Sequence, residues 1–390
     1  MSKPKDGYAE MQKKVLFIAH VENHLLNFHL PFFAYFRTKG WQVHVATSMG
    51  KRREELLRLG VVCHHVDFAR SPFSLSNIKA FRQLCKVMKR ERFSLVHVHT
   101  PVGAFLGRLA AMLTATKPVV YTVHGFHFYQ GSPVRNWLLY YPLERLAARW
   151  TDELVAINRE DYELAKKLPL RVKGAVSLLG GVGLDLQLYC CDENGVRSQV
   201  RDSLGFKADD LLMLFVGEFI ARKNHLQSFH MLRELAAERE NIFLLLAGEG
   251  EYEQEFHARL KKLGITERVR FLGFRRDIPD LLCASDLLLL TSFHEGLPRA
   301  VMEAMAVGKP VVATDIRGNS DLIVDGENGF LVPVHDVEKT TEAVRKLAAD
   351  RELAARMGKR GREMVKPYAL EQVLAEMEQV YARALKSGLL

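Results

Sequence analysis

Short apolar runs alternate with amphipathic stretches along most of the chain, and this alternation predicts an α/β fold. A run of four to six Val, Leu, Ile or Ala residues without a polar face is typical of a strand buried in a parallel sheet. In the first half we expect strands at residues 15–19, 43–46, 61–66, 95–98, 119–123, 154–157 and 175–179. In the second half we expect strands at residues 211–216, 242–247, 269–272, 287–290 and 311–313.

Longer stretches with apolar residues every three or four positions predict helices between these strands, which is the pattern of a doubly wound parallel sheet. One such helix spans 25–39, and another spans 75–89 with a basic polar face. Glycines and polar residues at 180–183 and 192–195 interrupt the alternation, so we place a domain boundary there. The chain is therefore expected to form two Rossmann-like α/β domains, 1–184 and 185–367, that face each other across a cleft.

The most informative stretch follows the leucine run at 287–290. Gly296 gives the turn after this strand its freedom, and Pro298 suits the first turn of a helix that continues to residue 307. The N-terminus of that helix offers N–H groups and a positive dipole to an anion such as phosphate. Glu295 in the loop and Glu303 on the helix flank this anion site, and both can accept hydrogen bonds from hydroxyl groups. A sugar nucleotide presents this combination of diphosphate and hydroxylated rings.

Two other strand ends in the second half carry matching chemistry. Gly217 allows a tight exit from the strand at 211–216, and Arg222 and Lys223 follow before the next helix. Two cations beside a helix N-terminus are suited to clamp a diphosphate. After the strand at 269–272, the backbone from Gly273 to Arg275 is placed to pair with the edge of a nucleobase.

Histidines gather after the strands of the first half. His124 and His127 follow the strand at 119–123, where an imidazole can hydrogen-bond a hydroxyl or a transferring group. Asn23 and His24 follow the first strand. His97 and His99 alternate along a strand, and we expect one to face the ligand and the other the core.

We also considered whether His20, His24, His124 and His127 hold a metal ion. Their spacing matches no metal motif, and no Asp-x-Asp pair follows a strand, so the sequence predicts no metal and no cofactor.

Composition narrows the classes of function. With 48% apolar and 26% charged residues in 390, the chain can bury two cores. Residues 1–185 carry 27 Lys and Arg against 14 Asp and Glu, whereas the remainder carries 28 against 32. This basic half carries no nucleic-acid-binding motif, so anionic lipid headgroups or a phosphate-bearing acceptor fit it better. The five cysteines show no metal or redox spacing and are expected to be reduced, with no signal peptide or membrane span in the sequence.

Taken together, these motifs resemble the GT-B glycosyltransferases of the large retaining family 4. The resemblance is carried by the Glu-x7-Glu spacing of Glu295 and Glu303, by Gly308–Thr314, by Gly217–Asn224 and by His124-Gly125. It differs in two places, because Glu218 stands where many relatives have Arg, and residues 21–24 replace a Gly-rich loop. We expect Arg222 to supply the missing cation.

The resemblance assigns roles to these residues. It implies that Glu295 contacts the donor sugar, Glu303 the ribose and Lys223 the diphosphate, and that His124 lies beside the transferring sugar. It also implies that a terminal helix, residues 368–390, crosses back to the first domain. The catalytic candidates are therefore His124 and Glu295, and the acceptor-side candidates are Asn23, His24 and His127. The donor-binding candidates are Gly217, Arg222, Lys223, Gly273, Arg275, Glu295, Gly296, Leu297, Pro298, Arg299 and Glu303.

Residues 29–32 and 40–46 resemble a bacterial subgroup that builds surface polysaccharides or lipid-linked glycans, often from UDP-N-acetylhexosamines. The expected reaction is metal-independent transfer of a hexosyl or N-acetylhexosaminyl group, with retention, from a UDP-sugar to a hydroxyl of a lipid-linked or polysaccharide acceptor. The expected location is cytoplasmic, peripheral on the inner face of the cell membrane. Two alternatives remain at this point: a UDP-sugar 2-epimerase, and a non-catalytic subunit that binds a nucleotide sugar.

Overall fold

The computed structural model describes residues 12–50, 52–69, 71–189 and 195–388, and the chain divides into two compact units. Unit 1 comprises residues 1–182 and 374–390, and unit 2 comprises residues 183–373. Both units are parallel α/β sheets, so the predicted fold class is confirmed.

Unit 1 is built on a seven-stranded sheet with the order β3-β2-β1-β4-β5-β6-β7. The chain moves outward from β1 to β3 and then returns to β4, which pairs with β1. The carboxyl ends of β1 and β4 therefore form a topological switch point, where open α/β sheets bind ligands. The strands are β1 (Lys14–Val21), β2 (Gln42–Ser48), β3 (Val62–His65), β4 (Leu95–Val98), β5 (Val119–Val123), β6 (Glu153–Ala156) and β7 (Ala175–Leu178).

The helices of unit 1 connect these strands, and one of them differs from the sequence prediction. The helix expected at 25–39 is two helices, because His29 leaves the helical region (φ −119°, ψ 2°) and Pro31 opens a new helix. Proline lacks an N–H and its ring clashes with the preceding turn, so it disfavours a continuous helix here. The helices are α1 (Glu22–Phe28), α2 (Leu30–Thr38), α3 (Arg53–Arg58), α4 (Ser76–Glu91), α5 (Pro101–Leu113), α6 (Val134–Ala148) and α7 (Arg159–Ala165).

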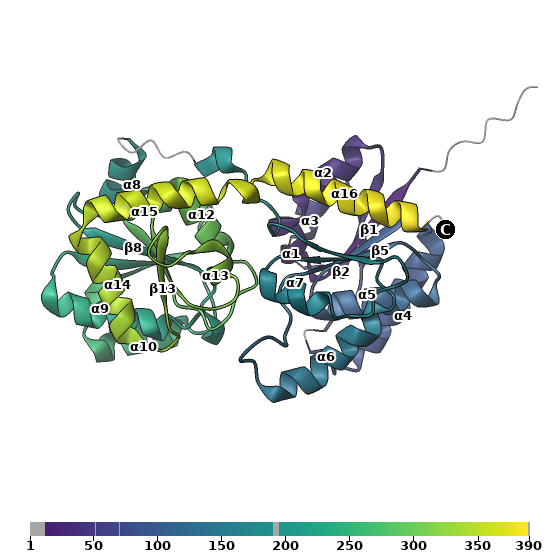
Figure 1. Ribbon diagram of the computed structural model, residues 1–390, viewed down its shortest axis with the longest axis horizontal. Helices are drawn as coiled ribbons and strands as arrows, with labels where there is room; N and C mark the ends of the chain where they lie inside the picture. Colours follow the sequence, from purple (N-terminus) through teal and green to yellow (C-terminus); the bar gives the residue numbers. More distant parts are fainter. Residues whose placement is uncertain (1–11, 51, 70, 190–194, 389–390) are drawn as a thin grey trace, which may run out of the picture. The chain divides into compact units, whose positions relative to one another are not determined.

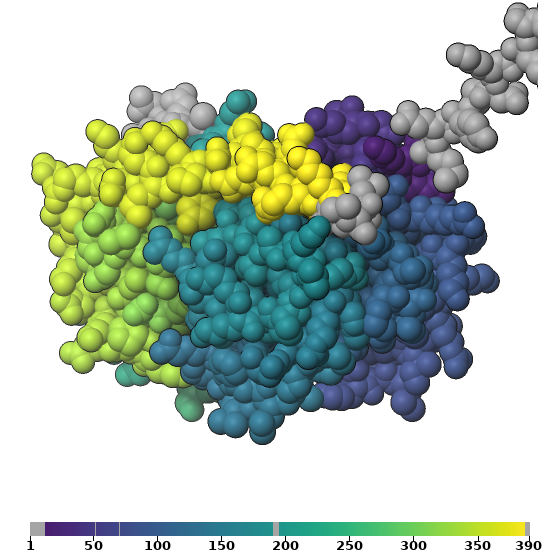
Figure 2. All heavy atoms as spheres, turned by 45° about the vertical axis from the view of Figure 1, so that its right-hand side comes forward, coloured from purple at the N-terminus to yellow at the C-terminus, as the bar shows by residue number. Residues whose placement is uncertain are grey.

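The last helix, α16 (Leu370–Gly388), begins in unit 2 and ends in unit 1 (Figure 1). Tyr381 on this helix is 2% exposed, and its hydroxyl lies 2.9 Å from Nδ1 of His97 on β4. Arg383 donates to the carboxylate of Glu153 on β6 at 2.9 Å. In the space-filling view the yellow atoms of α16 lie against the teal surface of unit 1 (Figure 2). α16 is therefore held to the first sheet by one buried and one partly exposed polar contact.

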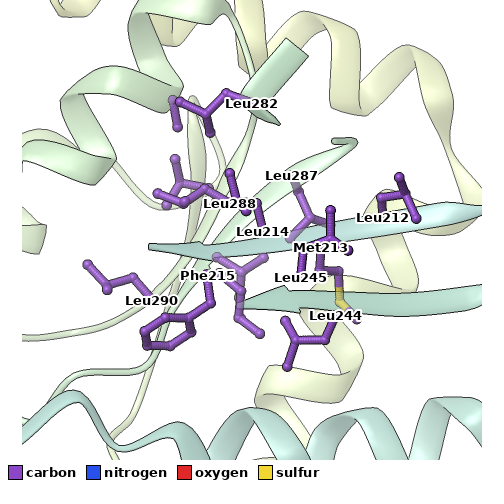
Figure 3. Packing of buried hydrophobic residues seen from close by; sticks show 14 of the residues in the cluster. Leu212, Met213, Leu214, Phe215, Leu244, Leu245, Leu282, Leu287, Leu288 and Leu290 are labelled. Carbon is purple, nitrogen blue, oxygen red and sulfur yellow. The ribbon is translucent and has the colours of Figure 1, made fainter. Parts of the chain in front are cut away.

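Unit 2 is built on a six-stranded sheet with the order β10-β9-β8-β11-β12-β13. Its switch point lies between β8 and β11, which pair directly. The four leucines of β11 are at most 1% exposed, and they pack with β8 and β9 in the centre of the core (Figure 3). The strands are β8 (Leu211–Val216), β9 (Ile242–Ala247), β10 (Val269–Gly273), β11 (Leu287–Leu290), β12 (Val311–Thr314) and β13 (Gly329–Val332).

The helices of unit 2 include two that the sequence reading missed, α8 and the single turn α13, and it also missed strand β13. α8 carries few apolar residues, and β13 begins with a glycine and holds only three apolar residues, so neither gives a clear periodic signal. The α-helices are α8 (Val196–Leu204), α9 (His225–Glu238), α10 (Glu253–Leu263), α11 (Ile278–Ala284), α12 (Arg299–Val307), α13 (Asn319–Leu322), α14 (Val337–Ala349) and α15 (Arg351–Met364). The 3-10 turns are η1 (Leu186–Tyr189), η2 (Ala221–Lys223), η3 (Thr266–Arg268) and η4 (Lys366–Tyr368).

The cysteines differ from expectation at one position. Cys63 and Cys85 are free thiols, whereas Cys283 is disulfide-bonded, so the prediction that all five are reduced is wrong. An odd number of cysteines without a sequence motif does not exclude a pair formed by proximity in the fold. Cys190 and Cys191 lie outside the described residues. In the part of the chain that the structure describes, no helix combines the length and apolar character needed to cross a bilayer.

Candidate functional site

The switch point of unit 2 brings together two of the loops singled out in the sequence. β8 ends at Val216 and leads through Gly217 to η2, which carries Arg222 and Lys223. β11 ends at Leu290 and leads to the loop of Glu295. The backbone N–H of Phe293 donates to the carbonyl of Arg222 at 2.8 Å, so the two loops are joined along their backbones.

Glu295 is the centre of this site. Its side chain is 8% exposed, and each carboxylate oxygen has a cationic partner. Lys223 Nζ donates to Oε1 at 2.7 Å, and Arg222 Nη1 donates to Oε2 at 2.9 Å. The hydroxyl of Ser292 donates to Oε1 at 2.7 Å. Two cations and one carboxylate leave a net positive charge at the carboxyl end of the sheet.

The ionisation of Glu295 follows from these contacts. Burial alone would raise the pKa of the Glu295 carboxyl, but the charges of Lys223 and Arg222 act in the opposite direction. Together with the hydrogen bonds from Lys223 and Ser292, they lower this pKa to about 2. Glu295 is therefore a carboxylate at neutral pH, an acceptor of hydrogen bonds and not a general acid.

Glycines allow these loops to approach each other closely. A Cβ on Gly217 would lie 3.1 Å from Cε of Lys223, so the lysine side chain lies across the glycine. A Cβ on Gly248 would lie 1.9 Å from the carbonyl oxygen of Gly217, which excludes any larger residue there without backbone movement. The loop after β9 thus presses on the loop after β8 and fixes the position of Lys223.

Glu303 forms a second, separate contact set on α12. It is 7% exposed, and its Oε1 accepts from Tyr189 Oη and from Arg299 Nε, both at 2.8 Å. Tyr189 comes from η1, far from α12 in sequence, and burial raises the pKa of its hydroxyl. α12 begins at Arg299, and Pro298 is its N-cap residue. The sequence had suggested that this proline lies inside the first turn of the helix.

The loop after β12 closes the other side of the Glu295 loop. Arg317 Nε donates to the backbone carbonyl of Glu295 at 3.1 Å, and Thr314 Oγ1 donates to the carbonyl of Ser292 at 2.6 Å. Gly318 has φ +83°, and a Cβ there would lie 2.5 Å from the carbonyl oxygen of Gly296. Three neighbouring strand ends therefore hold the Glu295 loop in one conformation.

The backbone proposed to meet a nucleobase lies after β10. Gly273 has φ +64°, and its carbonyl accepts from the N–H of Gly248 at 2.9 Å. The N–H of Phe274 donates to Glu249 at 3.2 Å, and Arg275 forms an ion pair with Asp277. These contacts place Gly273 beside the loop after β9, and two strands, β9 and β8, separate β10 from the strand that precedes Glu295.

A different group of polar side chains lies at the switch point of unit 1. One ligand atom from each of four imidazoles lies within 4.8 Å of the others, and we call these residues the histidine cluster: His24, His29, His99 and His124. His99 and His124 directly follow β4 and β5, while His24 lies on α1 and His29 at the bend before α2. Burial lowers the pKa of all four rings, in His124 to about 4, so they are neutral at pH 7.

The other histidines of unit 1 have different surroundings. His97 lies between Tyr381 and the hydroxyl of Thr122, at 2.9 and 2.8 Å. The ring centroids of His97 and His99 are 4.1 Å apart, and both side chains are buried. The prediction that they face opposite sides is therefore wrong, because residues two apart on a strand share a face.

A cavity of about 540 Å³ opens beside the histidine cluster's strands in unit 1. His20 and His127 are among its polar lining, and the ring of His127 packs edge-on against Tyr140 at 4.7 Å. Its apolar lining includes Phe73, Val102, Phe105, Leu106 and Leu143.

Comparison with known proteins connects these two units to one family. The family "Glycosyl transferases group 1" matches residues 196–364, and "Glycosyl transferase 4-like" matches residues 14–158. EpsD of Bacillus subtilis (strain 168), provisionally named a glycosyltransferase, is 37% identical over 375 residues, which cover 95% of this chain and 97% of EpsD. The chain belongs to the family 4 glycosyltransferases.

Two further proteins extend the comparison. The UDP-Gal:alpha-D-GlcNAc-diphosphoundecaprenol alpha-1,3-galactosyltransferase of Escherichia coli is 29% identical over 284 residues, 72% of each chain. The crystal structure of Anabaena Alr3699/HepE in complex with UDP and glucose superposes with a TM-score of 0.80 at 20% identity, and covers 95% of this chain and all of that one. This likeness supports the GT-B fold of the present glycosyltransferase.

Several contacts of the candidate site were not expected from the sequence. Tyr189, Arg317 and Gly318 contact the two glutamates or their loop and lie outside the motifs, whereas Ser292 begins the stretch of Glu295 but was given no role. Of these residues, Gly318 could have been found from the sequence. It follows β12 by four residues, and a glycine shortly after a strand of this sheet indicates a close approach between loops. Asn23, by contrast, is exposed and accepts from Arg52 at 3.4 Å, away from the cluster's shared nitrogens.

Proposed function

We propose that this glycosyltransferase transfers a hexosyl or N-acetylhexosaminyl group from a UDP-sugar to a hydroxyl of a lipid-linked or polysaccharide acceptor. We further propose that the anomeric configuration is retained and that no divalent ion is needed at the diphosphate. The observation that carries the donor half is the meeting of Arg222 and Lys223 on Glu295 at the unit 2 switch point.

The charges of this site suit a departing diphosphate. When the bond between the sugar carbon and the diphosphate oxygen breaks, the electron pair and the negative charge remain on that oxygen. Lys223 and Arg222 carry one positive charge more than Glu295 cancels, and the N-terminus of α12 adds a positive dipole. These groups take the place that a divalent ion has in other phosphate sites, which is the physical basis for proposing metal-independent transfer. The oxygen of the acceptor hydroxyl forms the new bond to the sugar carbon, and its proton passes to the departing diphosphate oxygen, which has gained the electron pair.

The two glutamates are proposed to hold the rings on either side of the diphosphate. Glu295 has pKa about 2 and so offers a carboxylate to sugar hydroxyls at any physiological pH. Glu303 is held by Tyr189 and Arg299 in a fixed position on α12, where it can accept from ribose hydroxyls. His124 is proposed to contact the transferring sugar, and Gly273 to Arg275 the base.

A panel of UDP-sugars tests the donor half. We expect Lys223→Ala and Glu295→Ala to lower kcat by about 10²–10³, because each removes a charge aligned with the transition state or its partner. Lys262→Ala, an exposed lysine at the end of α10, is the matched control and should keep wild-type rates. Near-wild-type turnover by either site variant would show that its assigned role is wrong. Conversion of one UDP-sugar into another without acceptor would indicate an epimerase instead.

Two further readouts test the chemistry. The anomeric coupling constant of the transferred sugar in the product, measured by NMR, should show the configuration that the donor had. Initial rates should be the same with and without added Mg²⁺ or Mn²⁺. An inverted product, or a rate that depends on these ions, would contradict the corresponding part of the proposal.

The apolar cavity of unit 1 supports a lipid-linked acceptor. Its apolar walls from α5 and α6 suit a hydrocarbon chain, and His20 and His127 provide polar groups at the same cavity. The E. coli relative is named for a diphosphoundecaprenol acceptor. We expect Phe105→Glu to raise KM for a polyprenyl-diphosphate acceptor at least about tenfold while KM for the UDP-sugar stays unchanged. Equal effects on both KM values would place the acceptor elsewhere.

The surface of α4 supports attachment to an anionic membrane. Five exposed basic residues line one side of it: Lys79, Arg82, Lys86, Lys89 and Arg90. Phe73 and Leu75, at the start of this segment, are 65% and 82% exposed. Basic side chains next to exposed apolar ones are typical of segments that rest on anionic lipid.

Sedimentation with vesicles tests this attachment. At low salt we expect the wild type to sediment with phosphatidylglycerol vesicles and not with phosphatidylcholine vesicles. Lys86→Glu with Lys89→Glu should abolish most of this binding, whereas Lys346→Glu on α14 of unit 2 should not. Equal recovery with the two vesicle types would contradict membrane attachment.

A further inference from the structure

The nitrogens of the histidine cluster have the spacing of a metal coordination sphere. Nε2 of His124 lies 3.2 Å from Nε2 of His24 and 3.3 Å from Nδ1 of His99. A tetrahedral ion with metal–nitrogen bonds of about 2.0–2.1 Å separates its ligand atoms by about 3.3–3.4 Å. The two spacings at Nε2 of His124 therefore match the edge of such a tetrahedron, and one nitrogen from each of the four rings lies within 4.8 Å of the others.

Hydrogen bonding alone does not satisfy these rings. An imidazole nitrogen carries either one hydrogen or one in-plane lone pair, so Nε2 of His124 can form a good hydrogen bond with only one of its two neighbours. Among the described residues, neither ring nitrogen of His29 has a hydrogen-bond partner, and Nε2 of His99 has none either. His29 is 1% exposed and His99 is fully buried. Buried polar atoms without partners are rare because each one costs free energy, so this group calls for a further ligand.

We propose that the histidine cluster binds one divalent transition-metal ion and that this ion is Zn²⁺. Neutral imidazole is a preferred ligand of zinc and of the neighbouring ions cobalt, nickel and copper. The histidine cluster contains no carboxylate, so Mg²⁺, Ca²⁺ and Mn²⁺, which prefer oxygen ligands, fit it poorly. The occupant is thus distinguished from any ion that would act on a diphosphate.

Strand ends and a helix bend position the histidines of the cluster. His99 and His124 are the first residues after neighbouring strands, and parallel strands end at the same edge of the sheet. His29 is turned inward at the bend that Pro31 imposes between α1 and α2. Four ligands from three segments far apart in sequence show no motif spacing, which is why the sequence predicted no metal here.

The proposal goes beyond the transferase reaction but shares one residue with it. An ion would occupy Nε2 of His124, the atom that faces His24 and His99. Only Nδ1 of His124 would then remain to hydrogen-bond a transferring sugar. The ion would position this ring next to the acceptor cavity, and its presence can be measured without any turnover.

Metal content is the first test. The full chain is purified without a polyhistidine tag, passed through gel filtration and analysed by mass spectrometry for zinc, cobalt, nickel and copper. The expected result is about one Zn²⁺ per chain, either as purified or after addition of Zn²⁺ and removal of excess. Replacement by Co²⁺ should give the visible absorption bands of a tetrahedral site with nitrogen ligands.

Variants test which residues bind the ion. His29→Gln and His99→Gln should each weaken Zn²⁺ binding by more than about tenfold, since loss of even an outer partner of a ligand costs that much. His64→Gln is the matched control: His64 is a buried histidine of the same unit, 2.8 Å from His44 and outside the cluster, and its loss should leave binding unchanged. If a buried variant does not fold, the partly exposed His24 is changed to Gln instead.

Two results would overturn the proposal. One is an affinity of the wild type for Zn²⁺ weaker than about 10 µM in competition with a chromophoric chelator, given that built zinc sites bind far more tightly. The other is wild-type binding by a folded cluster variant. Either result is independent of the sugar-transfer assays, so failure of the metal site would leave the proposed transferase function untouched.

Discussion

Replacing Glu295 by Gln should destabilise unit 2 by an amount that the structure allows us to calculate. The pKa of this carboxyl falls from an ordinary value of 4.5 to about 2 in the folded protein. A change of this size corresponds to about 3 kcal/mol of interaction between the ionised group and its surroundings. Because Glu295 is 8% exposed, little of this interaction is lost to solvent screening. Gln keeps the shape of the side chain but leaves Lys223, whose side chain is 12% exposed, without a counter-charge.

The pH dependence of this effect has a definite sign. A carboxyl whose pKa is lowered by folding stabilises the protein above its unfolded pKa, and this stabilisation is lost as pH falls through the folded pKa. The wild type should therefore exceed Glu295→Gln by about 3 kcal/mol at pH 7 and by only about 2 kcal/mol at pH 3.5. The difference should approach zero near pH 2.

The distribution of tryptophans provides an internal control. Trp41, Trp137 and Trp150 are the only tryptophans of the chain, and all lie in unit 1. In urea unfolding at both pH values, the fluorescence transition should report unit 1 and should not differ between wild type and Glu295→Gln. The transition of unit 2, followed by far-UV circular dichroism, should move. A loss of less than about 1 kcal/mol at pH 7, or one that does not shrink at pH 3.5, would refute the ion-pair argument.

Three other substitutions test single contacts. Gly217→Ala places a methyl group 3.1 Å from the side chain of Lys223, so UDP affinity measured by calorimetry should fall about tenfold; unchanged affinity would mean that the lysine need not lie there. Tyr189→Phe removes one hydrogen bond from Glu303, so the Kd for UDP should rise about fivefold, equivalent to about 1 kcal/mol; an unaltered Kd would separate Glu303 from nucleotide binding. Tyr381→Phe leaves a buried imidazole of β4 without its partner and should cost about 1–2 kcal/mol in the tryptophan transition only; a shift in unit 2 alone would contradict the attachment of α16 to the first sheet.

The parts of the fold that the sequence predicted well are those set by local patterns. The apolar runs at β8, β9 and β11 are uninterrupted, buried along most of their length and bounded by turns, so their strand assignment needs no tertiary information. The break at His29 was missed because the apolar periodicity continues on both sides of it. Pro31 is the signal in the sequence that indicates this break. β13 was missed because it begins at Gly329 directly after Asn328, a pair typical of turns, which leaves only three apolar residues for a pattern.

Contacts between side chains could be predicted only where a strand order was implied. Lys223 and Glu295 were expected at one edge of the sheet because both follow strands, and the order β8-β11 makes those two strands neighbours. Tyr189 reaches Glu303 from a segment outside the sheet, so strand order gives no information on it. Arg317 donates to the backbone carbonyl of Glu295. Every residue type has such a carbonyl, so the sequence gives no sign of this contact.

The two switch points show how one topology supports opposite electrostatics. In both sheets the chain leaves one strand, winds outward and returns beside it, so polar residues at the strand ends must meet. In unit 2 two cationic side chains surround Glu295, whose pKa of about 2 keeps it ionised at neutral pH, and glycines let the loops that carry these residues approach closely. Because the loops are already held in place, an anion that binds there would not have to order them. The free energy of binding would therefore not be reduced by a cost of loop ordering. In unit 1 the corresponding residues are neutral imidazoles, and among the described residues three of their nitrogens lack hydrogen-bond partners. On the two proposals above, the same edge of the same architecture binds a diphosphate in one unit and a metal ion in the other.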